Sequence, residues 1–176
     1  MTSPEFSRPI RVDALGAEPT RIAIEADAAE RAAVAKRFGL PAIARLAAEA
    51  ELVRENEAIV ATGRLRATVT QSCVASGDPV DAEIDEPFEL VFRRRPTTAR
   101  PDEEVELSEA ELDVIFHDGA SVDLGEAAAE TLALSLDPYP RAAGADAALK
   151  AAGVKSEEEA GPFGALAGPR DKMKKP

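Results

Sequence analysis

The fold is decided by one stretch, AIVATGRLRATVTQSCVASGDPVDAEIDEPFELVFR, which runs from Ala58 to Arg93. In its first half the apolar residues occupy mainly odd positions, from Ile59 to Cys73. In its second half the parity reverses, and the apolar residues occupy even positions from Val80 to Phe92. Such alternation is typical of strands that bury one face. The stretch therefore predicts a long antiparallel hairpin over residues 58–93.

The predicted turn of this hairpin is Ser76-Gly77, because a glycine at that place suits a two-residue primed turn. Such a turn fixes which residues of the two strands stand opposite each other. The resulting register matches apolar residues and opposite charges: Leu65 with Phe88, Val69 with Ile84, and Arg64 with Glu89.

Further elements are expected on both sides of the hairpin. Ile22 and Ile24 alternate with polar or small residues and predict a short strand. Asp27 and Glu30 form a capping box for a helix near 27–38, which Gly39 ends. Pro41 is expected to open another short helix, through Ile43 and Leu46.

A second main helix is expected near 123–136, with Asp123 as its N-cap. The predicted fold class is α+β, an antiparallel sheet around the 58–93 hairpin with helices near 27–38 and 123–136 packed on it. The pattern leaves open whether this sheet closes into a barrel. Residues 1–141 are expected to form a single domain with an acidic linker at about 97–112. Residues 142–176 are expected to be a mostly disordered tail, with a short helix at Ala145 to Ala152.

Charge and composition exclude several classes of protein. The chain has 176 residues and a formal net charge of −12, so its overall field does not attract nucleic acid or anionic membranes. One cysteine and one histidine allow neither an internal disulfide nor a Cys/His zinc cage. The longest uncharged stretch, Ala67 to Gly77, is too short to span a bilayer. We expect a cytoplasmic protein without a membrane association.

No pattern in the sequence points to catalysis. Cys73 is interpreted as a small buried hydrophobe, and the alternative of a nucleophile paired with His117 has no support from neighbouring residues. The acids Asp118, Asp123, Glu126 and Glu130 have oxygens that suit a hard cation, but helix capping explains Asp123 and Glu126 as well. Since phosphate-binding and hydrolase motifs are also missing, we expect a non-enzymatic protein with no cofactor, metal or catalytic residues.

Two basic clusters are candidates for contacting RNA phosphates. Arg93, Arg94 and Arg95 end the second strand of the hairpin, and Lys172, Lys174 and Lys175 lie near the C-terminus. Each has a simpler reading, as a solvated strand end and as a solubilising tail.

An acidic block lies between these clusters. From Asp102 to Glu130 there are eleven acidic residues and no lysine or arginine. Such a block has the charge that steers a basic protein partner, whereas an acidic linker is the simpler reading. The candidate partner contacts are its first six acids: Asp102, Glu103, Glu104, Glu106, Glu109 and Glu111.

Four segments taken together resemble the YceD family: Val69–Val80, Val122–Glu126, Glu130–Arg141 and Gly161–Ala167. The first is similar to that family's central hairpin, and the next two to its C-terminal helix and proline-rich exit. The last is similar to its Asn-Pro-Phe-Ala-x-Leu-Ala ending. Many members carry Cys-x-x-Cys at the hairpin turn. Here Ser76 takes the second position after Cys73, so the resemblance carries over no metal or redox role.

The resemblance implies a ribosome-biogenesis role in bacteria or plastids, in synthesis, processing or stability of the large-subunit (23S) ribosomal RNA. Two hypotheses follow. In the first, the chain binds the large-subunit rRNA or a pre-ribosomal particle through its basic clusters. In the second, it is an acidic adaptor for a basic large-subunit ribosomal protein and affects rRNA indirectly. Neither hypothesis involves DNA or a membrane.

Overall fold

The computed structural model describes residues 4–95 and 114–154. Seven strands and three α-helices are present in this part of the chain, with one short 3-10 turn at Val12–Ala14. In chain order they are β1 (Pro9–Arg11), β2 (Thr20–Glu25), α1 (Ala28–Phe38), β3 (Ala42–Glu55), β4 (Ala58–Ser72), β5 (Pro79–Arg94), β6 (Val114–His117), β7 (Ser121–Asp123), α2 (Leu124–Ser135) and α3 (Ala145–Ala151).

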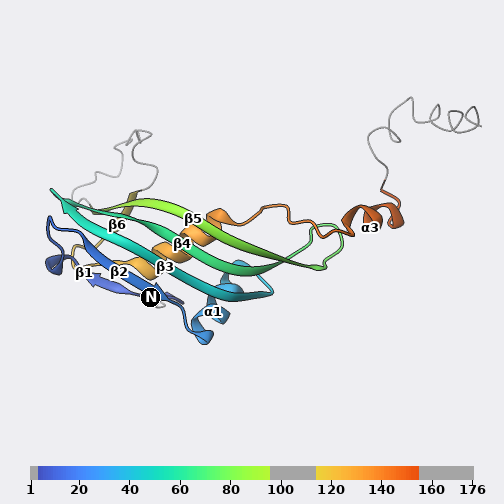
Figure 1. Ribbon diagram of the computed structural model, residues 1–176, viewed down its shortest axis with the longest axis horizontal. Helices are drawn as coiled ribbons and strands as arrows, with labels where there is room; N and C mark the ends of the chain where they lie inside the picture. Colours follow the sequence, from blue (N-terminus) through green and yellow to red (C-terminus); the bar gives the residue numbers. More distant parts are fainter. Residues whose placement is uncertain (1–3, 96–113, 155–176) are drawn as a thin grey trace, which may run out of the picture. The chain divides into compact units, whose positions relative to one another are not determined.

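The chain divides into two compact units. The first comprises Met1–Gln71 and Asp81–Pro138, and the second comprises Ser72–Val80 and Tyr139–Pro176. The first unit contains most of a five-stranded sheet in the order β2-β3-β4-β5-β6, together with a two-stranded sheet formed by β1 and β7. Figure 1 shows β2 to β5 running side by side.

The α+β class and the predicted hairpin are confirmed. All neighbours in the large sheet whose pairing is described are antiparallel except β5 and β6, which are parallel. Within the described residues the sheet stays open, because β2 and β6 are its two ends and do not pair with each other. The barrel that the sequence left open is therefore not found there.

The predicted short helix after Pro41 is wrong, because this segment begins β3. Alanine and glutamate favour a helix when considered locally. However, Leu46, Ala48, Ala50 and Leu52 are all buried, with exposed or half-exposed residues between them. This two-residue period fits a central strand, and β3 pairs with β2 on one edge and with β4 on the other. Tertiary burial outweighs local propensity here.

The predicted turn and register of the hairpin are also corrected. The backbone N–H of Cys73 donates to the carbonyl of Asp78 at 2.8 Å, and that of Gly77 donates to the carbonyl of Cys73 at 2.9 Å. Cys73 therefore stands opposite Asp78, whereas the predicted register placed Ala75 opposite Asp78. The loop between the two strands is longer than the predicted two-residue turn. A shift of two residues keeps every side chain on its predicted face. For this reason the alternation was read correctly although the pairing was not.

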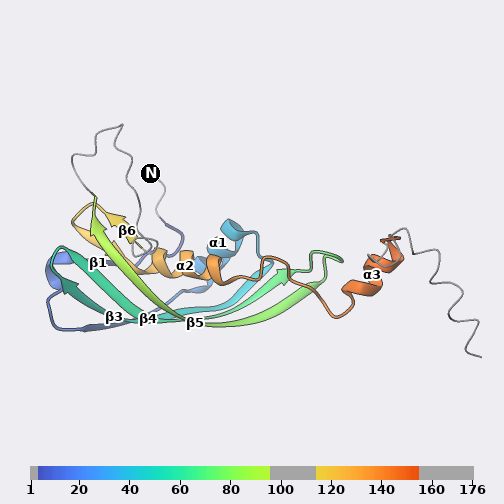
Figure 2. The ribbon, with the colours of Figure 1, turned by 90° about the horizontal axis from the view of Figure 1, so that it is seen from above.

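Both main helices lie on one side of the five-stranded sheet (Figure 2). Asp27 and Glu30 form the predicted capping box of α1, and Gly39 ends it with a left-handed φ of 66°. Asp123 caps α2 as predicted. The helices bury small apolar residues against the sheet, which fits a chain with 36 alanines.

The opposite side of the sheet carries neither α1 nor α2, and we call it the open face. It presents the odd positions of β2, of β3 from Arg45 onward and of β5, and the even positions of β4, while the other parity mostly faces the core. Before the bulge between Ile43 and Arg45 the parity of β3 is reversed, and Ile43 is buried. Helix α3 falls within the predicted 142–176 tail, where a short helix was expected. The domain boundary at 141 stays a prediction, and the linker at about 97–112 lies outside the described residues.

Candidate functional site

The three candidate arginines lie together at one end of the large sheet. Arg93 and Arg94 are the last residues of β5 and Arg95 follows it, directly after the buried Phe92. All three are exposed. Because side chains alternate along a strand, Arg93 points to the open face and Arg94 to the opposite face. Cations therefore stand on both faces of this sheet end.

Strand β6 fixes the backbone of this end. It runs parallel to β5, with Arg93 beside Phe116 and Arg94 beside His117, and the N–H of Arg95 donates to the carbonyl of His117 at 3.0 Å. The Arg94 side chain lies across Gly119, where a Cβ atom would come within 2.9 Å of its Nε atom. Gly119 has a φ of 99°, which favours glycine. Strand β6 thus holds the backbone of all three arginines, and the Arg94 side chain also lies against Gly119.

A hollow of about 410 Å³ lies next to these residues. Arg93 and Arg94 line one side, and the β3–β4 turn from Glu55 to Ala58 lines the other. The carboxylates of Glu55 and Glu57 also line the hollow, which therefore contains both acidic and basic groups. Its cations suit phosphate oxygens, since guanidinium groups bind phosphate with two parallel hydrogen bonds.

His117 is a neutral residue in this site. Burial lowers its pKa, Asp118 acts in the opposite direction, and the nearby Arg94 guanidinium lowers it further. Its Nδ1 atom accepts a hydrogen bond from the N–H of Gly119 at 3.0 Å. His117 therefore adds no positive charge at neutral pH, and its hydrogen bond stabilises the turn after β6.

The other arginines on the open face are engaged in ion pairs. Each pairs with an acid on a neighbouring strand: Arg21 with Glu51 at 2.6 Å, Arg64 with Asp85 at 2.7 Å and Arg66 with Glu49 at 3.3 Å. All of these residues except Asp85 line a shallow groove of about 590 Å³ in the middle of the face. In this groove each of the three arginines already pairs with an acid on a neighbouring strand.

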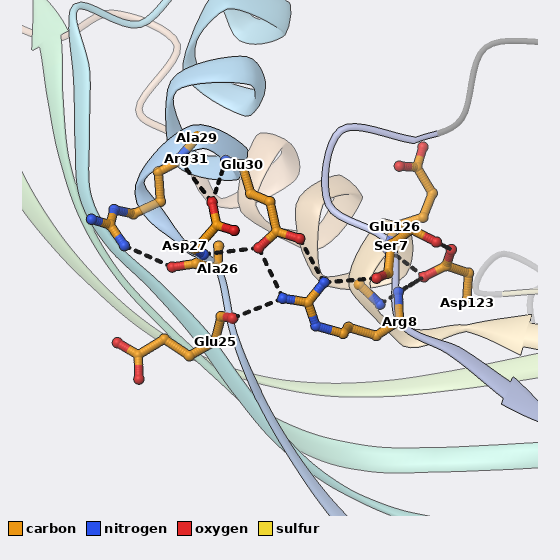
Figure 3. Close-up of polar contacts among 11 residues, drawn as sticks. Ser7, Arg8, Glu25, Ala26, Asp27, Ala29, Glu30, Arg31, Asp123 and Glu126 are labelled. Carbon is orange, nitrogen blue, oxygen red and sulfur yellow. Dashed lines mark hydrogen bonds and ion pairs between the residues drawn. The ribbon is translucent and has the colours of Figure 1, made fainter.

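A second cluster of polar contacts has a structural role that the sequence did not indicate (Figure 3). Arg8 donates to both carboxylate oxygens of Glu30, at 2.6 and 2.8 Å, and to the carbonyl of Glu25 at 3.1 Å. The backbone N–H of Arg8 donates to Asp123 at 2.7 Å. Arg8 thus ties the N-terminal segment to the starts of α1 and α2.

Three described acids of the acidic block have structural partners too. Asp118 accepts from the N–H of Ala120, and Glu126 pairs with Arg37 at 2.9 Å. Asp123 caps α2. Among residues 4–95 and 114–154, no group of three or more His, Cys, Asp or Glu side chains is arranged to hold a metal ion.

Cys73 belongs to the second unit, and its predicted burial is confirmed, since it is 3% exposed. Hydrogen bonds from the Ser76 hydroxyl and from the backbone N–H of Ala142 lower the pKa of its thiol to about 6, although burial acts in the opposite direction. The sequence did not predict this lowered pKa. The signal available was the serine three residues after the cysteine.

Other candidate residues cannot be placed. The lysines Lys172, Lys174 and Lys175 lie outside the described residues, and so do six acids: Asp102, Glu103, Glu104, Glu106, Glu109 and Glu111. Their suggested contacts stay predictions. No helix in the described part of the chain is long and apolar enough to cross a membrane.

Comparison with known families agrees with the resemblance noted in the sequence. Residues 61–171, more than half of the chain, match the family described as large ribosomal RNA subunit accumulation protein YceD. The chain belongs to the YceD family, whose name associates it with accumulation of the large ribosomal RNA subunit. No curated protein and no solved structure matches the chain.

Proposed function

We propose that this protein is a non-enzymatic, cytoplasmic ribosome-biogenesis factor that binds large-subunit (23S) rRNA, or a pre-ribosomal particle, through Arg93, Arg94 and Arg95. It would support the synthesis, processing or stability of that RNA without a cofactor. Membership of the YceD family supports the biological role. The observation that carries the mode of binding is the grouping of three exposed, consecutive arginines at one strand end.

The physical basis is local charge. A net charge of −12 opposes approach to RNA at long range, but screening limits this repulsion to about 8 Å at physiological salt. Within that distance the three arginines at the end of β5 can contact phosphates, with the carboxylates of Glu55 and Glu57 beside them. Each phosphate contact releases counterions, so three contacts predict a slope of log affinity against log salt of roughly −2 to −3.

The test compares two triple variants with the same change in charge. Arg93→Gln/Arg94→Gln/Arg95→Gln removes the proposed contacts, and Arg21→Gln/Arg64→Gln/Arg66→Gln removes three ion-paired arginines of the open face. Binding to large-subunit rRNA fragments is measured over a salt series. The first variant should lose most of its affinity and flatten the salt slope, while the second should retain both. Equal losses would refute the assignment, because net charge alone would then explain them.

The adaptor hypothesis gives a different result in cells. A tagged protein is recovered with its partners, and half of the sample is treated with ribonuclease. Loss of large-subunit material on treatment supports direct RNA binding. If one basic ribosomal protein remains bound, and changing the six acids from Asp102 to Glu111 to amides releases it, the chain is an adaptor and the RNA proposal fails.

A further inference from the structure

An apolar row crosses the open face next to the arginines. Val53 on β3 pairs with Val60 on β4, and Val91 on β5 pairs with Val114 on β6. All four valines are half-buried. They lie on a face that is otherwise charged, and the groove of ion pairs begins only a few residues further along the same strands.

The corrected register joins the two pairs into one row. With Cys73 opposite Asp78, counting along the strands brings Gly63 opposite Phe88 and Val60 opposite Val91. The position of a Cβ atom on Gly63, 2.7 Å from the Phe88 ring, agrees with this register. So does the hollow that Ala58 and Arg93 line together. The valines of four neighbouring strands therefore form a continuous apolar strip.

Phe116 stands at the edge of this strip. It is 49% exposed, unusually so for a large aromatic side chain in a strand. Its neighbour Ile115 packs against the core, so alternation turns Phe116 to the open face. The parallel register puts it directly beside Arg93. An exposed ring, an apolar strip and a guanidinium group are thus contiguous on one surface.

We infer that this surface is a stacking platform for an unpaired base of RNA, and this inference rests on the proposed function. The Phe116 ring would stack on the base, the valine strip would contact the base edge and ribose, and Arg93 would bind the adjoining phosphate. RNA-binding proteins recognise single strands by stacking bases on aromatic rings and neutralising the backbone beside them. A base within a helix cannot offer its face to Phe116, so the ligand is single-stranded.

Charge complementarity selects RNA as the occupant of the apolar strip. A nucleotide supplies an apolar ring and an anion at adjacent positions, and this surface offers an exposed aromatic ring and an apolar strip directly beside a guanidinium group. The separation between the base and the phosphate of a nucleotide matches the separation of Val91 and Arg93, which are two residues apart on β5.

The test uses two RNA probes of equal length, one unstructured and one a stable hairpin, each containing a fluorescent adenine analogue whose emission is quenched by stacking. Phe116→Ala should weaken binding of the unpaired probe by about tenfold and abolish its quenching. Binding of the paired probe should not change. Phe116→Tyr should retain both signals. Leu134→Ala, which removes an apolar side chain that is 88% exposed on α2, is the matched control and should behave as wild type.

The outcomes separate the two proposals. If the wild-type protein binds neither probe, the proposed function fails and the platform fails with it. If both probes bind and Phe116→Ala changes neither affinity nor quenching, only the platform is refuted. If Phe116→Ala leaves RNA binding intact but releases a protein from ribonuclease-treated extract, the surface binds protein and the inference is overturned. Circular dichroism melting of each variant verifies that it is folded.

Discussion

Gly63 is expected to be essential for the packing of β4, and Gly63→Ala tests this. A Cβ atom at this position would stand 2.7 Å from the Phe88 Cζ atom and 2.9 Å from the Ala50 Cα atom, and would also meet the carbonyl oxygen of Glu49. Carbon atoms in good contact are about 3.5–4.0 Å apart. The added methyl group therefore overlaps atoms on two neighbouring strands.

The size of the effect follows from which neighbours can move. The Phe88 ring can turn aside, but Ala50 and Glu49 contribute backbone atoms of β3, which hydrogen bonds to β2 and β4 hold on both sides. Overpacking costs about 1–3 kcal/mol, and the loss of glycine entropy from the unfolded chain returns about 0.4–1 kcal/mol. We expect a net loss of roughly 2 kcal/mol, which lowers the midpoint of thermal unfolding by about 4–8 °C.

The assay is thermal and urea unfolding of three proteins, followed by circular dichroism. Gly16→Ala is the control, because its Cβ atom would meet nothing closer than 3.9 Å. It should stay within about 0.5 kcal/mol of wild type. Adding Phe88→Leu to Gly63→Ala should relieve only part of the overlap, since the contacts with β3 remain. If Gly63→Ala is as stable as wild type, the close pairing of β3, β4 and Phe88 described above is wrong.

Three further predictions concern other parts of the chain. The Cys73 thiol should ionise near pH 6 when followed by thiolate ultraviolet absorbance, and Ser76→Ala should move this transition to higher pH, because the hydroxyl makes the largest contribution to the lowered pKa; an unmoved transition would contradict this. Glu30→Gln should reduce stability at neutral pH by about 1 kcal/mol or less, since both partners of the ion pair are partly solvated. Its hydrogen bond with Arg8 lowers the pKa of Glu30, so this contribution is present above the ordinary glutamate pKa and is lost as the pH falls through the lowered one. Urea titrations should therefore converge in acid, and a constant difference would exclude the carboxylate as its source. Gly125→Ala should cost roughly 2 kcal/mol in thermal unfolding, because its Cβ atom would lie 2.9 Å from the backbone nitrogen of Arg8; unchanged stability would show that the N-terminal segment is not held there.

The sequence predicts best where one local rule decides the structure. The caps at Asp27 and Asp123 need only a side chain and the next three residues, and both are confirmed. Which side chains of β4 and β5 face the core follows from the two-residue alternation alone. In contrast, β3 is rich in helix-forming residues, and its strand conformation depends on partners on both edges. The parallel pairing of β6 depends on how the chain returns after β5, for which the sequence holds no local signal.

The candidate site shows the same limit. The exposure of Arg93, Arg94 and Arg95 could be predicted from three consecutive charges at a strand end. From the sequence alone Phe116 has no predicted functional role, because its position beside Arg93 requires the parallel register of β6. A large exposed aromatic residue is apparent only when its neighbours are known. The platform therefore could not be found from the sequence.

The two-residue error in the predicted hairpin register also explains why the valine strip could not be predicted from the sequence. In the predicted register, Val60 stands opposite Arg93, and Val91 stands opposite Thr62. The apolar residues would then be scattered among polar ones, and no surface would suggest a ligand. In the observed register, Val60 meets Val91, and the strip continues into β3 and β6. A two-residue slip leaves the buried core almost unchanged, because every side chain keeps its face. What it rearranges is the order of side chains across the strands, and a surface that binds a ligand over four strands depends on that order.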